Sequence, residues 1–491
     1  MSSPVNIPLE SIIRFEPSST PIYLQLSRQL INAIQRGALA PGARLPGTRK
    51  LAEALKIHRK TVISALNELE AQGWIVVKPN VGTFVIEQTG TIITPSQRQD
   101  LTTLAHYPAR AGFSFSSSNL LDRPLNTVHT DLQFTDGQPD LRLAPLEKIS
   151  RTYRSVMNRG IAKRLLNYSY VPGTPYYRKH LARYLNDTRG LPIRAENILT
   201  TRGIQMGIYL TSMLLLQPDD IVVVGSTSHY VGNMIFQQAR AQILTVPVDE
   251  NGLSVEALRE LCQRRKIRML YLTPHHHYPT TVTLNAERRI EILRLAKEYG
   301  FIILEDDHDY DFHFDSSPLL PLASADTDGM VVYIGSFCKA LAPGLRQGYI
   351  VAPENVIHEL AKLRRIIDRQ GDLIMEQALG ELLEEGEIQR HLKKVQKIYH
   401  QRRDLFCQEL KTHFNSLLQF TQPSGGLAVW MEGIVPINLL RTSKNCEKMG
   451  LHLPHTLLFQ TRKLTALRLG FGNFNEKEIV SALTILRKAM V

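Results

Sequence analysis

Short apolar runs alternate with amphipathic helical patterns between residues 220 and 336. The apolar runs are DIVVVG, AQILTVPV, IRMLYLT, FIILEDD and MVVYIGS, and the helical patterns among them are VGNMIFQQAR, SVEALRELCQRR and AERRIEILRLAKEYG. Parallel strands need long crossover connections, usually helices, so this order predicts a mainly parallel sheet wrapped by helices. From about residue 375 onwards, helices and a polar strand region around SGGLAVW predict a smaller terminal subdomain.

The first part of the chain has a different pattern. Helical periodicity covers residues 21–36, 48–55 and 58–72, and Thr48 is the expected N-cap of the second helix. The segment WIVVKPNVGTFVI predicts two short strands around a turn at Pro79 and Asn80. Three helices with a tight connection between the last two, followed by a hairpin, predict a winged helix-turn-helix that is mainly α with a β-wing.

Charge and composition narrow the class of protein. The formal net charge of +12 favours a polyanionic partner, and residues 1–87 carry ten basic and six acidic side chains. A hydrophobic share of 43% argues against extensive disorder. The four cysteines form no CxxC pair and no apolar run is long enough to cross a membrane, so we expect a soluble, cytoplasmic protein.

The predicted second helix of the helix-turn-helix begins with basic and polar residues. Such a helix enters the major groove of DNA by its N-terminal end, while the preceding helix and the wing reach phosphates or the minor groove. The predicted DNA-binding residues are Arg49, His58, Arg59, Lys60, Thr61, Lys78 and Asn80. Over residues 21–85 the order PG-RLP-TR-LA, a tight turn and a GT-containing wing resembles the GntR family, with Gly47 in place of its common small hydroxyl residue.

The stretch GSFCKALAPGLRQGY places Lys339 just after a predicted strand, between Ser336 and Arg346. A lysine amine attacks an aldehyde only when it is deprotonated and held in place, and hydroxyl and guanidinium groups suit the phosphate of a phosphorylated cofactor. In FIILEDD, Asp306 is expected to follow a buried strand by one residue, where a carboxylate could keep a pyridine nitrogen protonated.

With these residues, the chain from 130 to 491 resembles fold-type I, α/β, aminotransferase-like proteins that bind pyridoxal 5'-phosphate (PLP). The joined architecture is similar to the MocR/GabR subfamily of GntR regulators. The resemblance implies that Lys339 forms a Schiff base, the internal aldimine, with PLP, that Asp306 pairs with the pyridinium nitrogen, and that Ser336 and Arg346 bind the phosphate.

The resemblance implies further roles. Gly203 and Gln205 fall where the family cradles phosphate at a helix N-terminus, and Arg468 matches the arginine that often receives a substrate carboxylate. Tyr168 matches a tyrosine that the family sends into the neighbouring subunit's phosphate site, which implies a homodimer with composite or swapped parts. The chain also departs from the family pattern at three positions.

The first departure is His308, which stands where relatives place a tyrosine near the cofactor ring. For the aromatic group that stacks on the ring, His229 has the best register and Tyr230 is the alternative. Cys338 replaces a frequent serine before the lysine.

Two other clusters are rich in potential metal ligands. In HHHYPT, three consecutive histidines on an extended segment cannot all point at one ion, and the segment takes the place of a family loop beside the cofactor. EDDHDYDFHFD has no defined ligand spacing. We expect no metal site in either segment.

The sequence therefore predicts a GntR-type winged-helix domain over 1–87, a Ser-, Thr-, Gln- and Pro-rich linker over 88–128, and an aminotransferase-like domain for PLP binding and dimerisation over 129–491. The leading hypothesis is a PLP-dependent transcription regulator that binds double-stranded promoter DNA and senses PLP or an amine through an aldimine. The alternatives are an active aminotransferase with an appended DNA-binding domain, and a large domain that serves only as a dimerisation scaffold.

Overall fold

The structure is a computed structural model that describes residues 13–17, 19–86, 109–115, 130, 132–315, 319–462 and 464–490. The chain divides into two compact units, Met1–Ser117 and Ser118–Val491. The predicted linker lies outside the described residues except for 109–115, so its boundaries stay a prediction. No helix in the described part of the chain has both the length and the apolarity needed to span a membrane.

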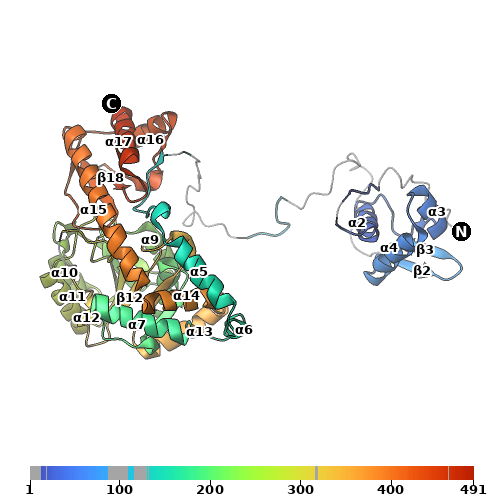
Figure 1. Ribbon diagram of the computed structural model, residues 1–491, viewed down its shortest axis with the longest axis horizontal. Coiled ribbons are helices and arrows are strands. Elements are labelled where there is room, and N and C mark those ends of the chain that lie inside the picture. The colour runs from blue at the N-terminus through green and yellow to red at the C-terminus, as the bar shows by residue number, and fades with distance from the viewer. Residues whose placement is uncertain are drawn as a thin grey trace. The chain divides into compact units, whose positions relative to one another are not determined.

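The first unit has the three helices and the hairpin that the sequence predicts (Figure 1). Its elements are α2 (Ile22–Gln35), β1 (Arg44–Leu45), α3 (Thr48–Ala54), α4 (Arg59–Ala71), β2 (Ile75–Lys78) and β3 (Gly82–Val85). Leu26, Leu30, Leu51, Val62 and Leu69 are buried in one core that joins the three helices. The short strand β1 pairs with β3, which the sequence did not indicate because two residues carry no periodicity.

The prediction for the start of α3 was wrong in detail. Gly47, not Thr48, is the N-cap, and its carbonyl oxygen accepts a hydrogen bond from the Leu51 N–H at 3.0 Å. Thr48 is the first helical residue, and its hydroxyl oxygen accepts a hydrogen bond from Nε of Arg59 on α4. The hydroxyl therefore joins the two helices instead of capping one of them.

A seven-stranded sheet in the order β5-β13-β12-β11-β10-β6-β7 forms the centre of the second unit. The predicted apolar runs form β6 (Ile221–Gly225), β7 (Gln242–Val246), β10 (Ile267–Leu272), β11 (Ile302–Asp307) and β12 (Val331–Ser336), all parallel. Two strands of this sheet were not predicted: β5 (Ile198–Thr201) and β13 (Gly348–Val351). Strand β13 runs antiparallel to both of its neighbours, β12 and β5. The mainly parallel sheet is thus confirmed.

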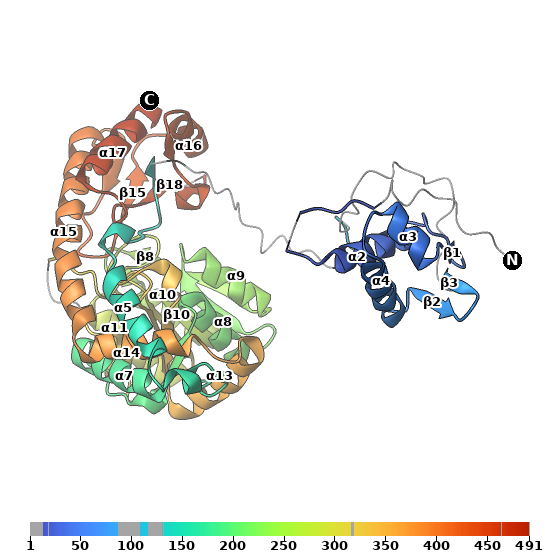
Figure 2. The same cartoon turned by 45° about the vertical axis from the view of Figure 1, so that its right-hand side comes forward.

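Helices cover both faces of this sheet (Figure 2). One face packs against α5 (Leu146–Met157), α7 (Pro175–Arg189), α10 (Val255–Arg264), α11 (Ala286–Tyr299) and α14 (Leu373–Glu384). The other packs against α8 (Ile204–Leu215), α9 (Tyr230–Gln238) and α13 (Glu354–Ile367). Side chains alternate between the faces along each strand, so Val223 and Leu270 enter the first core while Val222 and Met269 enter the second.

A smaller subdomain contains an antiparallel sheet in the order β14-β15-β18-β17. Its strands are β14 (Leu418–Phe420), β15 (Ala428–Gly433), β17 (Leu458–Gln460) and β18 (Thr465–Gly470), and its helices are α16 (Leu439–Lys448), α17 (Glu476–Met490) and the second half of α15 (Glu387–His413). The short strand β4 (Leu132–Gln133) joins it by pairing with β16 (Leu451–His452).

The predicted start of this subdomain near residue 375 was wrong. Leu379 and Leu382 of α14, and Ile388 at the start of α15, are buried in the core of the large sheet. Residues of α15 belong to the core of the smaller subdomain only from Val395 onwards. A long helix that runs through both cores has one continuous apolar stripe, so its periodicity does not mark the boundary.

Candidate functional site

A cavity of about 190 Å³ lies at the carboxyl ends of the central parallel strands. Ligands of open α/β sheets bind at this edge, because loops from several strands converge there. The lining residues are Asp136, Ile204, Gln205, His229, Tyr278, Asp306, His308, Ser336, Cys338, Lys339 and Arg346. The structure therefore brings together seven residues that the sequence analysis selected from four separate segments: Gln205, His229, Asp306, His308, Ser336, Lys339 and Arg346.

Lys339 follows β12 and is held by an ion pair. Its Nζ donates a hydrogen bond to Oδ1 of Asp309 at 2.6 Å, and the Asp309 side chain is only 1% exposed. Burial alone would raise the pKa of Asp309, but the charge of Lys339 and the nearby His308 and His276 hold that pKa well below its ordinary value. The carboxylate is therefore ionised and fixes the lysine nitrogen at the cavity.

Asp306 lies within the carboxyl end of β11, which continues to Asp307, instead of following the strand as predicted. Its Oδ2 accepts a hydrogen bond from the hydroxyl of Tyr271 at 2.7 Å. Its Oδ1 is buried and makes no hydrogen bond within the described part of the chain. A buried, unsatisfied carboxylate oxygen beside a cavity is suited to accept a proton-bearing group of a ligand.

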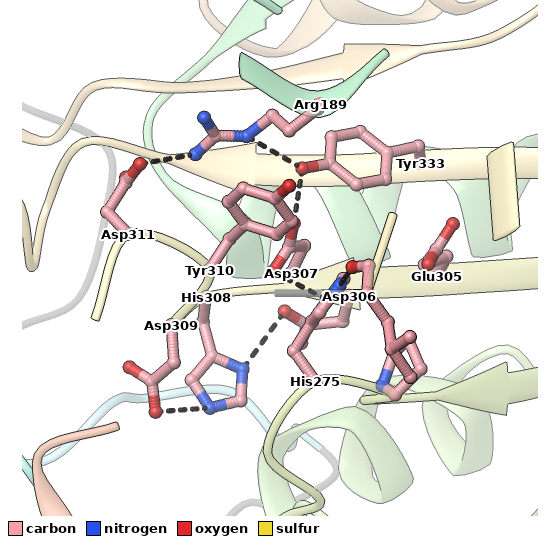
Figure 3. Close-up of polar contacts among 12 residues, drawn as sticks. Arg189, His275, Glu305, Asp306, Asp307, His308, Asp309, Tyr310, Asp311 and Tyr333 are labelled. Atoms are coloured by element: carbon pink, nitrogen blue, oxygen red, sulfur yellow. Dashed lines mark hydrogen bonds and ion pairs between the residues drawn. The ribbon is translucent and has the colours of Figure 1, made fainter. Parts of the chain in front are cut away.

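His308 lies between two carboxylates (Figure 3). Its Nδ1 is 3.4 Å from Oδ1 of Asp306, and its Nε2 is 3.4 Å from Oδ2 of Asp309. Through this ring the aspartate of β11 is connected to the aspartate that holds Lys339. A tyrosine at this position, as the family pattern has, could donate only one hydrogen bond.

A second polar network lies next to this one (Figure 3). Asp307 accepts a hydrogen bond from the Tyr333 hydroxyl, and its Oδ1 is 3.3 Å from Nδ1 of His275. Arg189 donates to the same Tyr333 hydroxyl and to Asp311. Burial alone would raise the pKa of Asp307, but His275 and Arg189 lower it to about 2, so the carboxylate stays ionised beneath the cavity.

Ser336 and Arg346 line one corner of the cavity, and Gly203 lies against Arg346 without being among the lining residues. Ser336 is the last residue of β12, and its Oγ accepts a hydrogen bond from the Cys338 N–H at 2.9 Å. Arg346 has a left-handed backbone with φ 51° and donates to the carbonyl oxygen of Arg202. Gly203 has φ 81° at the start of α8, and a Cβ there would lie 2.8 Å from Nη2 of Arg346. The free N–H groups of α8, a hydroxyl and a guanidinium thus surround a site suited to a dianion.

His229 and Tyr278 line another wall, with ring centroids 5.0 Å apart in an edge-on arrangement. Burial lowers the pKa of His229, so its ring is neutral. Tyr230, the alternative stacking residue, begins α9 and is not among the described residues that line the cavity. The geometry therefore favours His229 for the stacking role.

The family model of class I and II aminotransferases matches residues 132–448, which is more than half of the chain. The chain belongs to the class I and II aminotransferase family. Residues 22–85 match the gntR family of bacterial regulatory proteins, so the chain joins a GntR helix-turn-helix domain to an aminotransferase domain.

Relatives share this joined architecture. The chain is 29% identical over 454 residues to the uncharacterized HTH-type transcriptional regulator YdfD of Bacillus subtilis, covering 92% of both chains. It is 26% identical to the probable rhizopine catabolism regulatory protein MocR of Rhizobium meliloti, covering 84% of this chain and 81% of that one. Among solved structures, the kynurenine aminotransferase of Pyrococcus horikoshii, in complex with PMP, has a TM-score of 0.68 and 26% identity, covering 74% of this chain and 91% of that one.

Two residues that the family pattern singles out lie outside the cavity. Arg468 on β18 is 1% exposed, and its Nε donates to Oδ1 of Asp136, so Asp136 and not Arg468 is the lining residue. Tyr168 is 70% exposed, and the guanidinium carbon of Arg369 lies 3.9 Å from its ring centroid. Within one chain, the aminotransferase cavity does not include Tyr168.

The three consecutive histidines face three different surroundings. His275 lies 2.6 Å from the carbonyl oxygen of Leu319, and Nδ1 of His277 lies 2.8 Å from the Thr280 hydroxyl. The ring of His276 packs against Gly425, where a Cβ would lie 2.4 Å from its Nε2. Burial lowers the pKa of His276 and of His277 to about 3, so both rings are neutral.

In the first unit, the predicted DNA-binding residues lie on the ends of α3 and α4 and on the wing. All except the half-buried Thr61 are exposed: Arg49, His58, Arg59, Lys60, Lys78 and Asn80. His58 is the N-cap of α4, and its Nδ1 accepts a hydrogen bond from the Lys60 N–H. Asn80 has φ 60° in the turn between β2 and β3.

Sequence reasoning missed Asp136, Asp309 and Tyr278 as parts of the site. Asp309 belongs to the segment EDDHDYDFHFD and Tyr278 to the segment HHHYPT. Both segments contain so many polar residues that the sequence does not single out one of them as a site residue. Asp136 follows the two-residue strand β4 in a segment with no helix or strand periodicity. Only the pairing of β4 with the smaller subdomain brings it to the cavity.

Proposed function

We propose that this chain is a PLP-dependent transcription regulator, in which the winged helix binds promoter DNA and the aminotransferase-like domain binds an amine effector or PLP. The observation that carries the proposal is the presence, on one chain, of an exposed basic winged helix and a lysine-bearing cavity of aminotransferase type. Relatives named as transcriptional regulators along more than four-fifths of their length support it.

The cavity fits PLP at three places. The unsatisfied Oδ1 of Asp306 would accept the pyridinium N–H, Ser336, Arg346 and the start of α8 would hold the phosphate, and Lys339 would hold the aldehyde carbon. The ring of His229 would cover one face of the cofactor. When bound, PLP supplies an aldehyde that combines reversibly with primary amines.

The exposed position of Tyr168 supports a homodimer. A tyrosine that is 70% exposed and stacked under Arg369 is available to a second copy of the chain. We propose that it contacts the phosphate site of the partner subunit, as the family pattern implies. Each cofactor site would then be complete only in the dimer, which couples cofactor binding to the arrangement of two winged helices.

An effector changes DNA binding only if it binds one dimer arrangement better than the other. The amine would reach the cavity between Asp136, Tyr278 and His229, where the smaller subdomain meets the large one. The extent to which the smaller subdomain shifts toward the large sheet would then depend on which molecule occupies the cavity.

The test uses the purified full-length protein and DNA from upstream of its own gene. With PLP we expect a visible absorption band, and after borohydride reduction a mass increase on the peptide that contains Lys339. Lys339→Ala should lose both, whereas Lys362→Ala, whose side chain lies on the surface, should keep both. A band that persists unchanged in Lys339→Ala would exclude the proposed cofactor site, and the absence of any cofactor- or amine-dependent change in DNA binding would exclude the sensor.

The retained lysine and Asp306 also favour a second candidate, an active aminotransferase. The discriminating measurement is repeated turnover from an amino donor to a keto acid, because a single half-reaction is compatible with a sensor. The ion pair that occupies Arg468 favours the regulator, since a free arginine is the usual receptor for the carboxylate of an amino acid.

A further inference from the structure

Asp136 and Arg468 form an ion pair at the cavity. Nε of Arg468 lies 2.8 Å from Oδ1 of Asp136. The two residues are 332 positions apart in the sequence and come from the segment after β4 and from β18. The Asp136 side chain is 36% exposed and lines the cavity, whereas that of Arg468 is 1% exposed and lies behind it.

Two nitrogens of the Arg468 guanidinium donate hydrogen bonds. Besides the bond to Asp136, its Nη1 donates to the carbonyl oxygen of Pro279 at 2.8 Å, and its central carbon lies 4.8 Å from the ring centroid of Tyr278. An incoming carboxylate that bound the Nε side of this arginine would displace Asp136 from a buried cation. Breaking such a pair is unfavourable, because it leaves a charge without its partner.

The position of Asp136 is fixed by its own backbone. The neighbouring Thr135 accepts a hydrogen bond from the Gly470 N–H through its carbonyl oxygen at 2.8 Å. A Cβ on Gly470 would lie 2.4 Å from the Gly137 nitrogen, so the segment lies directly against the end of β18. Gly137 itself has φ 77°, which favours glycine. The close packing of the 135–137 backbone against the end of β18 therefore holds Asp136 next to Arg468.

The group that this wall presents to an effector is consequently the carboxylate of Asp136, since the guanidinium of Arg468 lies behind it. The cationic Arg346 lies in the corner proposed for the phosphate, and the His229 ring is neutral. We propose that Asp136 is a specificity-determining residue that makes the site prefer a diamine over an amine that carries a carboxylate. This inference rests on the proposed function, because it names the class of amine that the same cavity accepts.

The experiment compares three amines of the same chain length on the PLP-loaded, full-length protein: putrescine, butylamine and gamma-aminobutyrate. The readout is the concentration that half-completes the change in the visible band, with the shift in melting temperature as a second measure. We expect putrescine to bind about tenfold more tightly than butylamine, because it gains a charged hydrogen bond to Asp136, and gamma-aminobutyrate to bind most weakly. Equal or tighter binding of gamma-aminobutyrate than of butylamine would overturn the inference.

Variants test the residue itself. Asp136→Asn should remove the putrescine preference and strengthen gamma-aminobutyrate binding, whereas Asp136→Glu should keep the wild-type order. Asp249→Asn is the matched control, because Asp249 pairs with Arg288 through two contacts outside the lining of the cavity, and its order of affinities should not change. An unchanged order of the three affinities in Asp136→Asn would count against the inference. If that variant does not fold, the order of affinities measured on the wild-type protein tests the inference by itself. If wild type forms no band with PLP, the proposed function fails and this inference with it, whereas a band with a carboxylate preference overturns only the inference.

Discussion

The ammonium nitrogen of Lys339 lies 2.6 Å from Oδ1 of Asp309, whose side chain is 1% exposed. Asp309 in turn lies 3.4 Å from His308, which reaches Asp306 on its other side. The lysine and the aspartate proposed for the cofactor are thus linked by a carboxylate and an imidazole from one short segment.

Asp309→Asn should destabilise the cofactor-free protein by roughly 2 to 4 kcal/mol, because a mostly buried lysine would lose its counter-ion. Urea unfolding of the C-terminal unit measures the loss. The control is Asp328→Asn, which removes the exposed Lys297–Asp328 pair of 2.8 Å and should cost less than about 1 kcal/mol. Equal effects of the two variants would show that the Lys339–Asp309 pair is no more important than a surface pair.

Gly203→Ala should weaken PLP binding by about tenfold or more, since its Cβ would collide with the Arg346 guanidinium proposed for the phosphate. Gly300→Ala is the matched control, because Gly300 also has a positive φ, 71°, but no atom within 4 Å of the added carbon. It should lower stability by about 1 kcal/mol through backbone strain and leave PLP affinity unchanged. Absorbance titration with PLP separates the two, and equal PLP affinities would contradict the role of this corner.

Acidification should destabilise the C-terminal unit below the ordinary histidine pKa of 6.5, because burial lowers the pKa of His276 and of His277 to about 3. Between these values the unfolded chain binds protons that the folded chain does not, so stability falls as the pH falls. Going from about pH 7 to about pH 5, each histidine should contribute a loss of about 2 kcal/mol.

Urea unfolding at both pH values measures this loss, and His276→Gln should reduce it by about 2 kcal/mol. His358→Gln, at a side chain that is 71% exposed, should not alter it. The same pH dependence in wild type and His276→Gln would mean that His276 is not buried in the neutral form.

Lys60→Ala should weaken binding to specific and unrelated DNA alike and reduce the slope of log affinity against log salt by about 1, as expected for a phosphate contact. Lys60 is exposed at the N-terminal end of α4, where a recognition helix meets DNA. Arg28→Ala, on the exposed side of α2, is the control and should leave the slope unchanged. Fluorescence anisotropy over a range of salt concentrations measures both slopes.

Local patterns in the sequence were sufficient to predict much of the site. Lys339, Ser336 and Asp306 each lie at the carboxyl end of an apolar strand, and parallel strands bring these ends to one edge of a sheet. The helices and the wing of the first unit were predicted because their apolar residues repeat with the period of a helix or a strand. These features depend only on residues that are close in the sequence.

The sequence by itself determined that the chain combines a winged helix with a lysine-bearing α/β domain, because both follow from local periodicity and from residues at strand ends. Only the tertiary structure decided that Asp309 holds Lys339 and that Asp136, not Arg468, faces the cavity. The physical reason is that an ion pair depends on distance in space, and the segments carrying Asp136 and Arg468 meet only when β18 packs against the chain that follows β4. The pattern of apolar and polar residues in these two segments does not indicate that contact.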